Sequence, residues 1–160
     1  MKIRTVIAST SLVAAGATGA AALALSNSAT AVSGGASSFT VRVGHGTQAN
    51  IDLGKSGFSA GDESPFVAPL TRHGHHIGHA VGNCTTARVA RSADQLCEFV
   101  LVLGSKGQIT AEGAVRAGQS GPGTFQLPIV GGTGHYQGAA GHLSVTAGSG
   151  PSFPIKVSLR

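Results

Sequence analysis

The sequence contains no tryptophan and only one tyrosine, and charged residues make up only 11% of its 160 positions. Its lysines and arginines are scattered rather than clustered, although the formal net charge is +5. Single strands of nucleic acid are bound by aromatic platforms beside basic grooves, and the sequence encodes neither. We therefore expect no nucleic-acid partner and interpret the net charge as a contribution to solubility.

Several catalytic signatures are also missing. The glycine-rich residues 129–141 are not followed by Gly-Lys-Ser/Thr, have no dinucleotide-binding spacing and precede no helix-forming segment. Ser64 does not lie in a Gly-x-Ser-x-Gly context, so a hydrolase triad has no support. We expect no nucleotide or other cofactor.

Histidines are the conspicuous polar group, with His73, His75, His76 and His79 in one short segment. A His-x-His pattern in a strand places two imidazoles on one face, and neutral imidazole is a common metal ligand. However, no carboxylate or cysteine lies close in sequence to complete a site, and glycines surround the group. We expect a solvated hairpin tip and no metal site.

The chain after residue 31 has no segment with sustained helical periodicity. Short apolar or alternating runs, separated by Gly, Pro, Asn and Ser, predict strands instead. The nine predicted strands cover residues 39–43, 48–53, 66–70, 77–88, 96–103, 108–113, 125–130, 142–146 and 153–159. This density of strands predicts an all-β antiparallel barrel or sandwich, and closure into a barrel would also protect the sheet edges.

The first 31 residues have the pattern of a secretory signal peptide. One lysine and one arginine precede an uncharged run at residues 5–25, and residues 29–31 (Ala-Thr-Ala) fit a cleavage site. The run is also long enough for a membrane anchor, but its glycines and the cleavage pattern favour removal. We therefore expect a signal peptide at residues 1–31, a secreted domain at residues 32–160 and no membrane association after cleavage.

Cys84 and Cys97 are the only cysteines, and both lie in the part that we expect to be exported. In an oxidising compartment an even pair indicates a disulfide, and the spacing suits a bridge between two hairpin arms. Such a bridge contributes about 3 kcal/mol in the chain-entropy model. The alternative is a free thiol that acts as a nucleophile or metal ligand.

Residues 129–141 hold five glycines, and an interior glycine costs a helix about 1 kcal/mol. We predict a strand that ends at Val130, a tight turn, and a strand that restarts near His142. The Gly-Gly-Thr-Gly run permits positive φ and close approach of another backbone. Tyr136 follows this turn, where we expect it to close the end of a barrel; a hydrogen-bond donor role is the alternative.

These residues resemble the V/T-G-G-T-G-x-F/Y-x-x-A-x-G signature of the allene oxide cyclase and dirigent superfamily. Residues 61–66 resemble the G-D-x-x-P-F segment of plant allene oxide cyclases, and residues 77–84 resemble their V-G-I-T-A-G-x-C. Residues 107–113 and 153–156 resemble a G-H-I-S-V-Q-G strand and a final F-P-x-K run. The resemblance implies an eight-stranded antiparallel barrel of the calycin type with an apolar lumen, often assembled as a homotrimer. A barrel of this size can hold one small ligand.

The catalytic residues of these relatives are not present. The plant cyclases carry N-E-R-D-R-G-S-P in their first strand, whereas residues 44–49 are Gly-His-Gly-Thr-Gln-Ala. Ala68 stands where those cyclases have an asparagine, and Ala140 stands where dirigent proteins have an arginine. The resemblance therefore extends to the architecture and to neither known active site.

Strand alternation divides residues 76–86 into two faces, and Cys84 lies on the face of the even-numbered residues. The corresponding cysteine of the resembling cyclases faces the lumen, which implies that His76, Gly78 and Ala80 line a ligand site. Alternatively, the glycines of this strand only relieve crowding. Bulky substitutions at Gly78 or Ala80 would fill a lumen of this kind.

Asp62 is a further candidate for this site, as is Tyr136. A role for Asp62 in proton transfer would require burial that raises its pKa. The alternative is a turn-forming carboxylate, because Asp62 directly follows Gly61.

Two functional classes fit these observations. The first is an isomerase, cyclase or stereo-directing protein whose apolar lumen orients a flexible substrate and excludes water. The second is a non-catalytic binding or structural barrel. The expected partner is a small apolar or amphipathic molecule, and an open lumen would favour the first class, whereas the lost polar residues favour the second. Fold analogy alone does not decide between them.

The signal-peptide pattern generates a direct prediction. Export should remove residues 1–31, so that intact-mass measurement of the exported protein finds Val32 at the N-terminus. A membrane fraction that retains Met1 would contradict cleavage and favour the anchor.

Overall fold

The computed structural model describes residues 36–118, 123–146 and 152–160, and the predicted signal peptide lies outside this part. The described chain is almost entirely β-structure. Its elements are β1 (Ser37–Val43), β2 (Thr47–Gln48), β3 (Phe66–Arg72), β4 (His75–Val89), β5 (Ala93–Val102), the 3₁₀ turn η1 (Gly104–Lys106), β6 (Gln108–Ala117), β7 (Thr124–Gly132), the 3₁₀ turn η2 (Gly134–Tyr136), β8 (Gly141–Thr146) and β9 (Phe153–Leu159). Within these residues, no helix has the length and apolar character needed to cross a bilayer.

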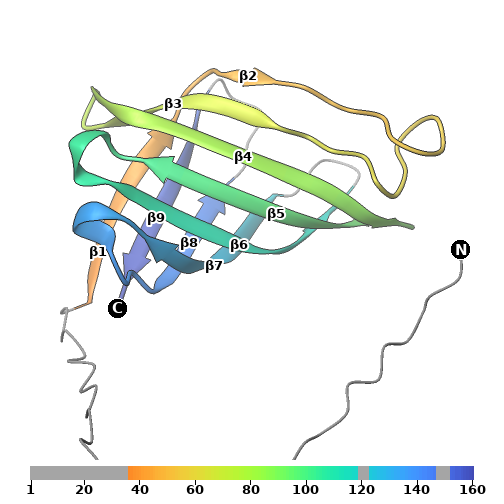
Figure 1. The fold of residues 1–160 in the computed structure, drawn as a ribbon. Helices are drawn as coiled ribbons and strands as arrows, with labels where there is room; N and C mark the ends of the chain where they lie inside the picture. Colours follow the sequence, from red (N-terminus) through yellow and green to blue (C-terminus); the bar gives the residue numbers. More distant parts are fainter. Residues whose placement is uncertain (1–35, 119–122, 147–151) are drawn as a thin grey trace, which may run out of the picture. The chain divides into compact units, whose positions relative to one another are not determined.

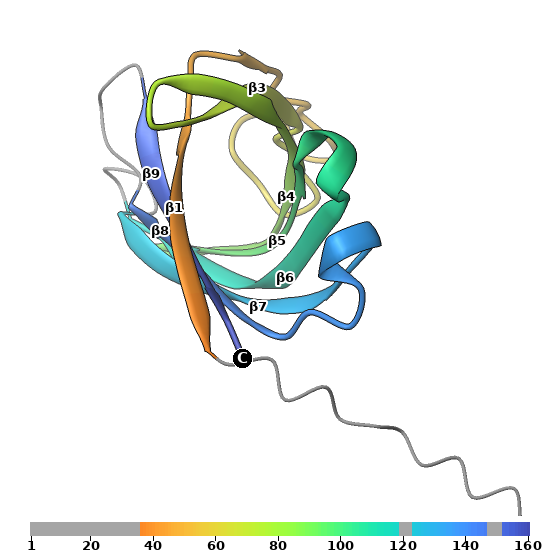
Figure 2. The same cartoon turned by 90° about the vertical axis from the view of Figure 1, so that its left-hand side faces the viewer.

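The strands form one antiparallel sheet that closes on itself. Its order is β1-β9-β8-β7-β6-β5-β4-β3, and β1 pairs again with β3 through Arg42 with Thr71 and Val43 with Leu70. Figure 2 shows the resulting ring of strands end-on, and β2 is an additional short strand on the free stretch of β3. The predicted eight-stranded antiparallel barrel is therefore confirmed.

The strand predicted at residues 48–53 is wrong in extent. Only β2 and one isolated bridge between Ile51 and Glu63 are present there. Gly54, Gly57 and Gly61 adopt positive φ, so the chain bends away from the sheet and forms a loop (Figure 1). The other predicted strands are found, and several extend further than the sequence indicates.

The core consists of side chains that point into the barrel. On β5, Cys97, Phe99 and Leu101 are buried, whereas Leu96 and Glu98 on either side of Cys97 are exposed. The largest buried side chains lie toward the end that carries η1 and η2, and they include Leu70, Leu101, Ile109 and Leu143. Full burial of one such side chain contributes about 1.5–3 kcal/mol.

The glycine signature forms the barrel end at which η1 and η2 lie (Figure 2). Gly107 has φ 107°, and a Cβ there would stand 2.1 Å from the carbonyl oxygen of Thr133. The backbone N–H of Thr133 donates to the carbonyl of Gln108 at 2.9 Å, and the N–H of Gln108 donates to Thr133 Oγ1 at 3.2 Å. This close approach of two loops places Tyr136 in the core cluster, with only 9% of its surface exposed.

Cys84 and Cys97 are register partners on β4 and β5 and form a disulfide. Their Cα atoms lie 4.1 Å apart, as expected for residues directly opposite each other in an antiparallel pair. The predicted bridge between hairpin arms is confirmed, and neither cysteine is a free nucleophile.

Candidate functional site

A cavity of about 680 Å³ lies at the end of the barrel away from η1 and η2, and we call it the lumen pocket. All eight strands of the ring contribute to its wall, together with the β1–β2 segment and β2. Its apolar lining includes Phe66, Phe99, Phe125, Phe153, Val115 and Val145. The inside of the barrel is therefore filled by side chains at one end and open at the other.

Four of the six phenylalanines of the chain line the lumen pocket. The ring centroids of Phe66 and Phe99 lie 5.1 Å apart with an interplanar angle of 78°. Those of Phe99 and Phe125 lie 6.1 Å apart at 82°. Edge-to-face pairs of this kind hold one another in place and present both ring edges and ring faces to an occupant.

The polar lining of the lumen pocket consists of amide and hydroxyl side chains and one imidazole. It consists of His45, Thr47, Gln48, Ser64 and Gln95, and it includes no aspartate, glutamate, lysine or arginine. Gln95 lies on β5, and its Nε2 donates to Oγ1 of the buried Thr86 at 3.3 Å. This hydrogen bond orients the Gln95 amide. Among the described residues, none donates a hydrogen bond to the amide oxygen.

The disulfide forms part of the same wall. Both Cys84 and Cys97 line the lumen pocket, as the resemblance implied for the cysteine of this strand. The two sulfurs lie on neighbouring strands beside Phe99, which is two residues from Cys97. The cross-link therefore fixes the spacing of β4 and β5 where they border the cavity.

The five residues proposed from the sequence as ligand-lining are not brought together, and none of them lines the lumen pocket. His76 is exposed, because the register with β3 shifts between Leu70 and Thr71: Leu70 pairs with Gly78, and Thr71 pairs with His76. Gly78 and Ala80 are buried. The alternation predicted for this strand is therefore wrong at its first position.

Gly78 is required for close backbone approach. It has φ 149°, and a Cβ there would stand 1.8 Å from the carbonyl oxygen of Val102. Gly78 therefore fits the alternative interpretation, in which the glycines of this strand relieve crowding. A bulky side chain at Gly78 would disrupt the pairing of β4 with β5 instead of filling the lumen.

Asp62 organises the loop between β2 and β3. Its carboxylate accepts the backbone N–H of Ser59 at 2.7 Å and that of Leu53 at 3.0 Å, and only 8% of the residue is exposed. These hydrogen bonds from Ser59 and Leu53 lower the pKa of Asp62 despite the opposing effect of burial. Asp62 is thus an ionised turn-forming residue beside a separate groove rather than an acid with a raised pKa.

The histidine segment is a hairpin tip, as predicted. His73 and Gly74 have φ values of 51° and 79° and connect the paired residues Arg72 and His75. A two-residue turn with both central φ values positive matches the twist of the strands. The histidines of this segment are exposed, and the described residues contain no group of three or more His, Cys, Asp or Glu arranged to hold a metal.

The sequence pattern does not indicate the phenylalanines that line the lumen pocket, although the resemblance pointed to Ala68 and Cys84 of the same wall. The phenylalanines lie on β3, β5, β7 and β9, and only closure of the ring brings them together. One signal was present: residues 44–48, which replace the polar run of the plant cyclases, line this pocket. The departure from the family pattern therefore lies at the cavity itself.

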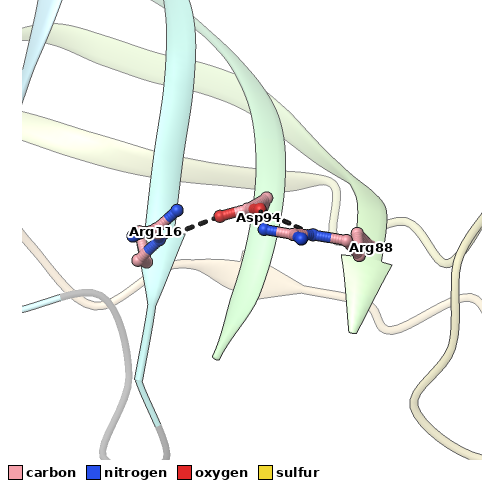
Figure 3. Close-up of polar contacts among 3 residues, drawn as sticks. All are labelled: Arg88, Asp94 and Arg116. Atoms are coloured by element: carbon pink, nitrogen blue, oxygen red, sulfur yellow. Dashed lines mark hydrogen bonds and ion pairs between the residues drawn. The ribbon is translucent and has the colours of Figure 1, made fainter. Parts of the chain in front are cut away.

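An ion-pair row spans three strands on the outer surface near the open end (Figure 3). Arg88, Asp94 and Arg116 are register partners on β4, β5 and β6. Nε of Arg116 donates to Asp94 Oδ1 at 3.0 Å, and Nε of Arg88 donates to Oδ2 at 2.9 Å. The hydrogen bonds from Arg88 and then Arg116 lower the pKa of Asp94. Because both arginine side chains are exposed and Asp94 is partly exposed, the row contributes little to the stability of the fold.

Known proteins share this barrel. Residues 40–151 match the model of a family described as the allene oxide cyclase barrel like domain. A solved structure of a pyocyanin demethylase matches with a TM-score of 0.68 and 27% identity, over 78% of this chain and all of that chain. No curated protein matches.

Two further solved structures resemble the chain at lower identity. An exo-specific intermolecular Diels-Alderase has a TM-score of 0.60 and 15% identity, over 79% of this chain and 98% of that chain. A pterocarpan synthase dirigent protein has a TM-score of 0.56 and 15% identity, over 78% of this chain and 92% of that chain. At these identities the likeness shows the fold alone.

The hydrogen bonds of Asp62 generate a prediction about stability and pH. Because the pKa is lowered on folding, the ionised carboxylate stabilises the protein above the ordinary value of 3.8, and this contribution is lost as the pH falls through the folded pKa. Asp62→Asn should therefore lower the free energy of unfolding at pH 7. The difference in this free energy between variant and wild type should become smaller when the pH falls below the ordinary pKa of 3.8.

Urea unfolding across this pH range measures the effect. Asp52→Asn is the matched control, because Asp52 is an exposed carboxylate of the same loop that accepts one N–H, from Gly57. An Asp62→Asn effect no larger than that of the control, or one independent of pH, would contradict the assigned role.

Proposed function

The chain belongs to the allene oxide cyclase barrel-like family, and we propose that its lumen pocket binds a small, uncharged and largely apolar molecule with a planar or aromatic part. The observation that supports this proposal is a barrel left open at one end between phenylalanine side chains. A barrel that served only as a structural unit would gain stability from filling this space.

The size and lining of the lumen pocket fit such a ligand. Its volume of about 680 Å³ falls within the range typical of small-molecule sites. Rings at Phe66, Phe99 and Phe125 offer stacking and edge contacts, which favour a flat ligand. A charged group would lose its hydration there without an opposite charge in the lining, so the pocket selects against ions.

Gln95 is the residue that we propose for orienting the ligand. Its amide nitrogen is engaged by Thr86, which leaves the amide oxygen to accept an O–H or N–H from the occupant. Gln48, Ser64 and Thr47 lie at the same end and supply further neutral partners. An apolar body with one neutral polar group satisfies both kinds of lining.

If the bound molecule reacts, we propose that the barrel acts by orientation and exclusion of water. The lumen-pocket lining contains His45 but no aspartate, glutamate, lysine or arginine, so proton transfer has few candidate groups. A cyclisation or stereo-directed coupling needs placement more than acid or base. The Diels-Alderase and dirigent names belong to proteins that share the fold, and the alternative of a non-catalytic secreted binding protein uses the same pocket.

The lumen pocket can be tested with N-phenyl-1-naphthylamine, a neutral aromatic probe whose emission rises in apolar surroundings. Wild type should bind it saturably. Ala68→Phe places a ring inside the pocket and should weaken binding by about tenfold or more, equivalent to about 1.4 kcal/mol. Pyocyanin, the compound in the name of the demethylase, is a second probe.

Val81→Phe is the matched control, because Val81 lies on the outside of the neighbouring strand and is 41% exposed. It adds the same ring without entering the lumen, so binding should be unchanged. Equal affinity in both variants, each with a wild-type unfolding midpoint, would place the probe elsewhere and reject the proposal.

The residues that replace the plant cyclase constellation generate a second prediction. Cyclisation of an allene oxide develops negative charge on oxygen, which takes placed donors or a held water. Residues 44–48 and Ala68 supply none of the acidic, asparagine or proline groups of the relatives. We expect freshly generated allene oxide to give a racemic cyclopentenone in the presence of the protein.

Chiral chromatography of the product measures this outcome. Heat-denatured protein is the control for the spontaneous reaction. A strong enantiomeric excess that disappears on denaturation would show that the barrel cyclises allene oxides without the familiar polar residues.

A further inference from the structure

A second cavity, of about 260 Å³, lies at the opposite end of the barrel from the lumen pocket. We call it the cationic end pocket, and it is lined by Phe39, Ile77, Leu103, Tyr136, Arg72 and Lys106, together with Gly104 and Ser105 of η1. Along β5 and its continuation, Gln95 faces the lumen pocket whereas Leu103 faces this one. Figure 2 views the barrel from this end, where η1 and η2 lie beside the ring.

The floor of the cationic end pocket is apolar and held in place. Leu103 and Tyr136 belong to the core cluster, with 5% and 9% of their surfaces exposed. The rings of Phe39 and Tyr136 lie 6.4 Å apart between centroids. Because the glycine-mediated contact between Gly107 and Thr133 fixes the two loops, the floor exists without a ligand.

Two cationic side chains, those of Arg72 and Lys106, also line this pocket. The guanidinium carbon of Arg72 lies 5.1 Å from the centroid of the Phe39 ring, a cation–π arrangement that orients the side chain. Lys106 comes from η1. Both residues are exposed, so their remaining N–H donors are accessible.

These cations have no carboxylate partner among the described residues. All six acidic residues of the chain are described, and none of them lines the cationic end pocket. The ion pairs of the described chain both use Asp94, which lies toward the other end. Two uncompensated positive charges beside one cavity attract an anion.

Tyr136 adds a neutral donor. Burial raises the pKa of its phenol, and the positive charge of Arg72 opposes this effect. The hydroxyl therefore keeps its proton at neutral pH and is able to donate to an anionic oxygen.

From this combination we infer that the cationic end pocket binds a small monocarboxylate with a compact apolar body. The carboxylate accepts charge-assisted hydrogen bonds from Arg72 and Lys106, and the body covers Phe39, Ile77 and Leu103. An inorganic anion would leave the apolar floor in water, and a neutral molecule would leave the cations unpaired. The volume lies below the range typical of drug-sized ligands, which limits the body to a single ring or a short chain.

The protein supplies its own reporter for this site. Tyr136 is the sole tyrosine and the chain has no tryptophan, so tyrosine emission reports on the cationic end pocket alone. Titration with cyclohexanecarboxylate, which does not absorb where tyrosine does, should change this emission saturably. Cyclohexylmethanol is a neutral analogue of similar shape. Its affinity should be lower by about tenfold or more, because it lacks the charge-assisted hydrogen bonds.

Charge variants test the named residues. Arg72→Gln and Lys106→Gln should each weaken cyclohexanecarboxylate binding by about tenfold, the effect of one hydrogen bond to a charged group. Lys156→Gln removes one charge from the exposed face of β9 and should leave the affinity unchanged. If Arg72→Gln unfolds because it loses the contact with Phe39, the test compares Lys106→Gln with the control Lys156→Gln.

Three outcomes would overturn the assignment. The alcohol binding as tightly as the acid would indicate an apolar cavity without anion selectivity. An equal loss in Lys156→Gln would indicate a response to net charge. Displacement of N-phenyl-1-naphthylamine by the acid would place the acid in the lumen pocket instead, whereas independent binding of the two probes supports two separate sites.

Discussion

The contact between β1 and β3 is the constraint on which the rest of the molecule depends. Two register pairs join these strands and convert a twisted sheet into a ring without long unpaired edges. Closure forces every second side chain of eight strands into one interior, where their summed volume decides how much space remains. It also positions the β1–β2 segment across the rim of the lumen pocket, because that segment leaves β1 directly after the closing pair.

The interior volume is distributed unevenly along the barrel axis. Leucine and isoleucine side chains fill the end near η1 and η2. The other end combines small residues such as Ala68 with phenylalanines that pack edge to face. Charge follows the same division: the lumen pocket lining has no aspartate, glutamate, lysine or arginine, and the opposite cavity carries Arg72 and Lys106. One small scaffold thus presents two environments that suit different kinds of molecule.

Most strand positions and the disulfide could be predicted from the sequence because they depend on local pattern. Local pattern left a barrel and a sandwich open, and the eight-stranded barrel followed from the family resemblance. Alternating runs predict strands, and the thirteen-residue spacing of Cys84 and Cys97 matches facing positions on two hairpin arms. The candidate site could not be predicted in the same way. His76 is exposed because of one bulge, which alternation alone does not reveal, and the loop from residue 49 to 65 follows its glycines and Asp62 instead of the sheet. The phenylalanines of the pocket come from four strands whose neighbours are known only after closure.

The glycine signature has a consequence for how barrels of this family are recognised. A Cβ at Gly132 would stand 2.4 Å from the carbonyl oxygen of Tyr136, and one at Gly141 would stand 1.9 Å from that of Ser158. These positions exclude side chains for reasons of backbone crowding, far along the axis from the lumen pocket. A search that detects the signature therefore selects chains for close backbone packing at this end of the barrel. Such a search does not read the residues that line the lumen pocket, so relatives must be sorted by the residues at their opposite rim.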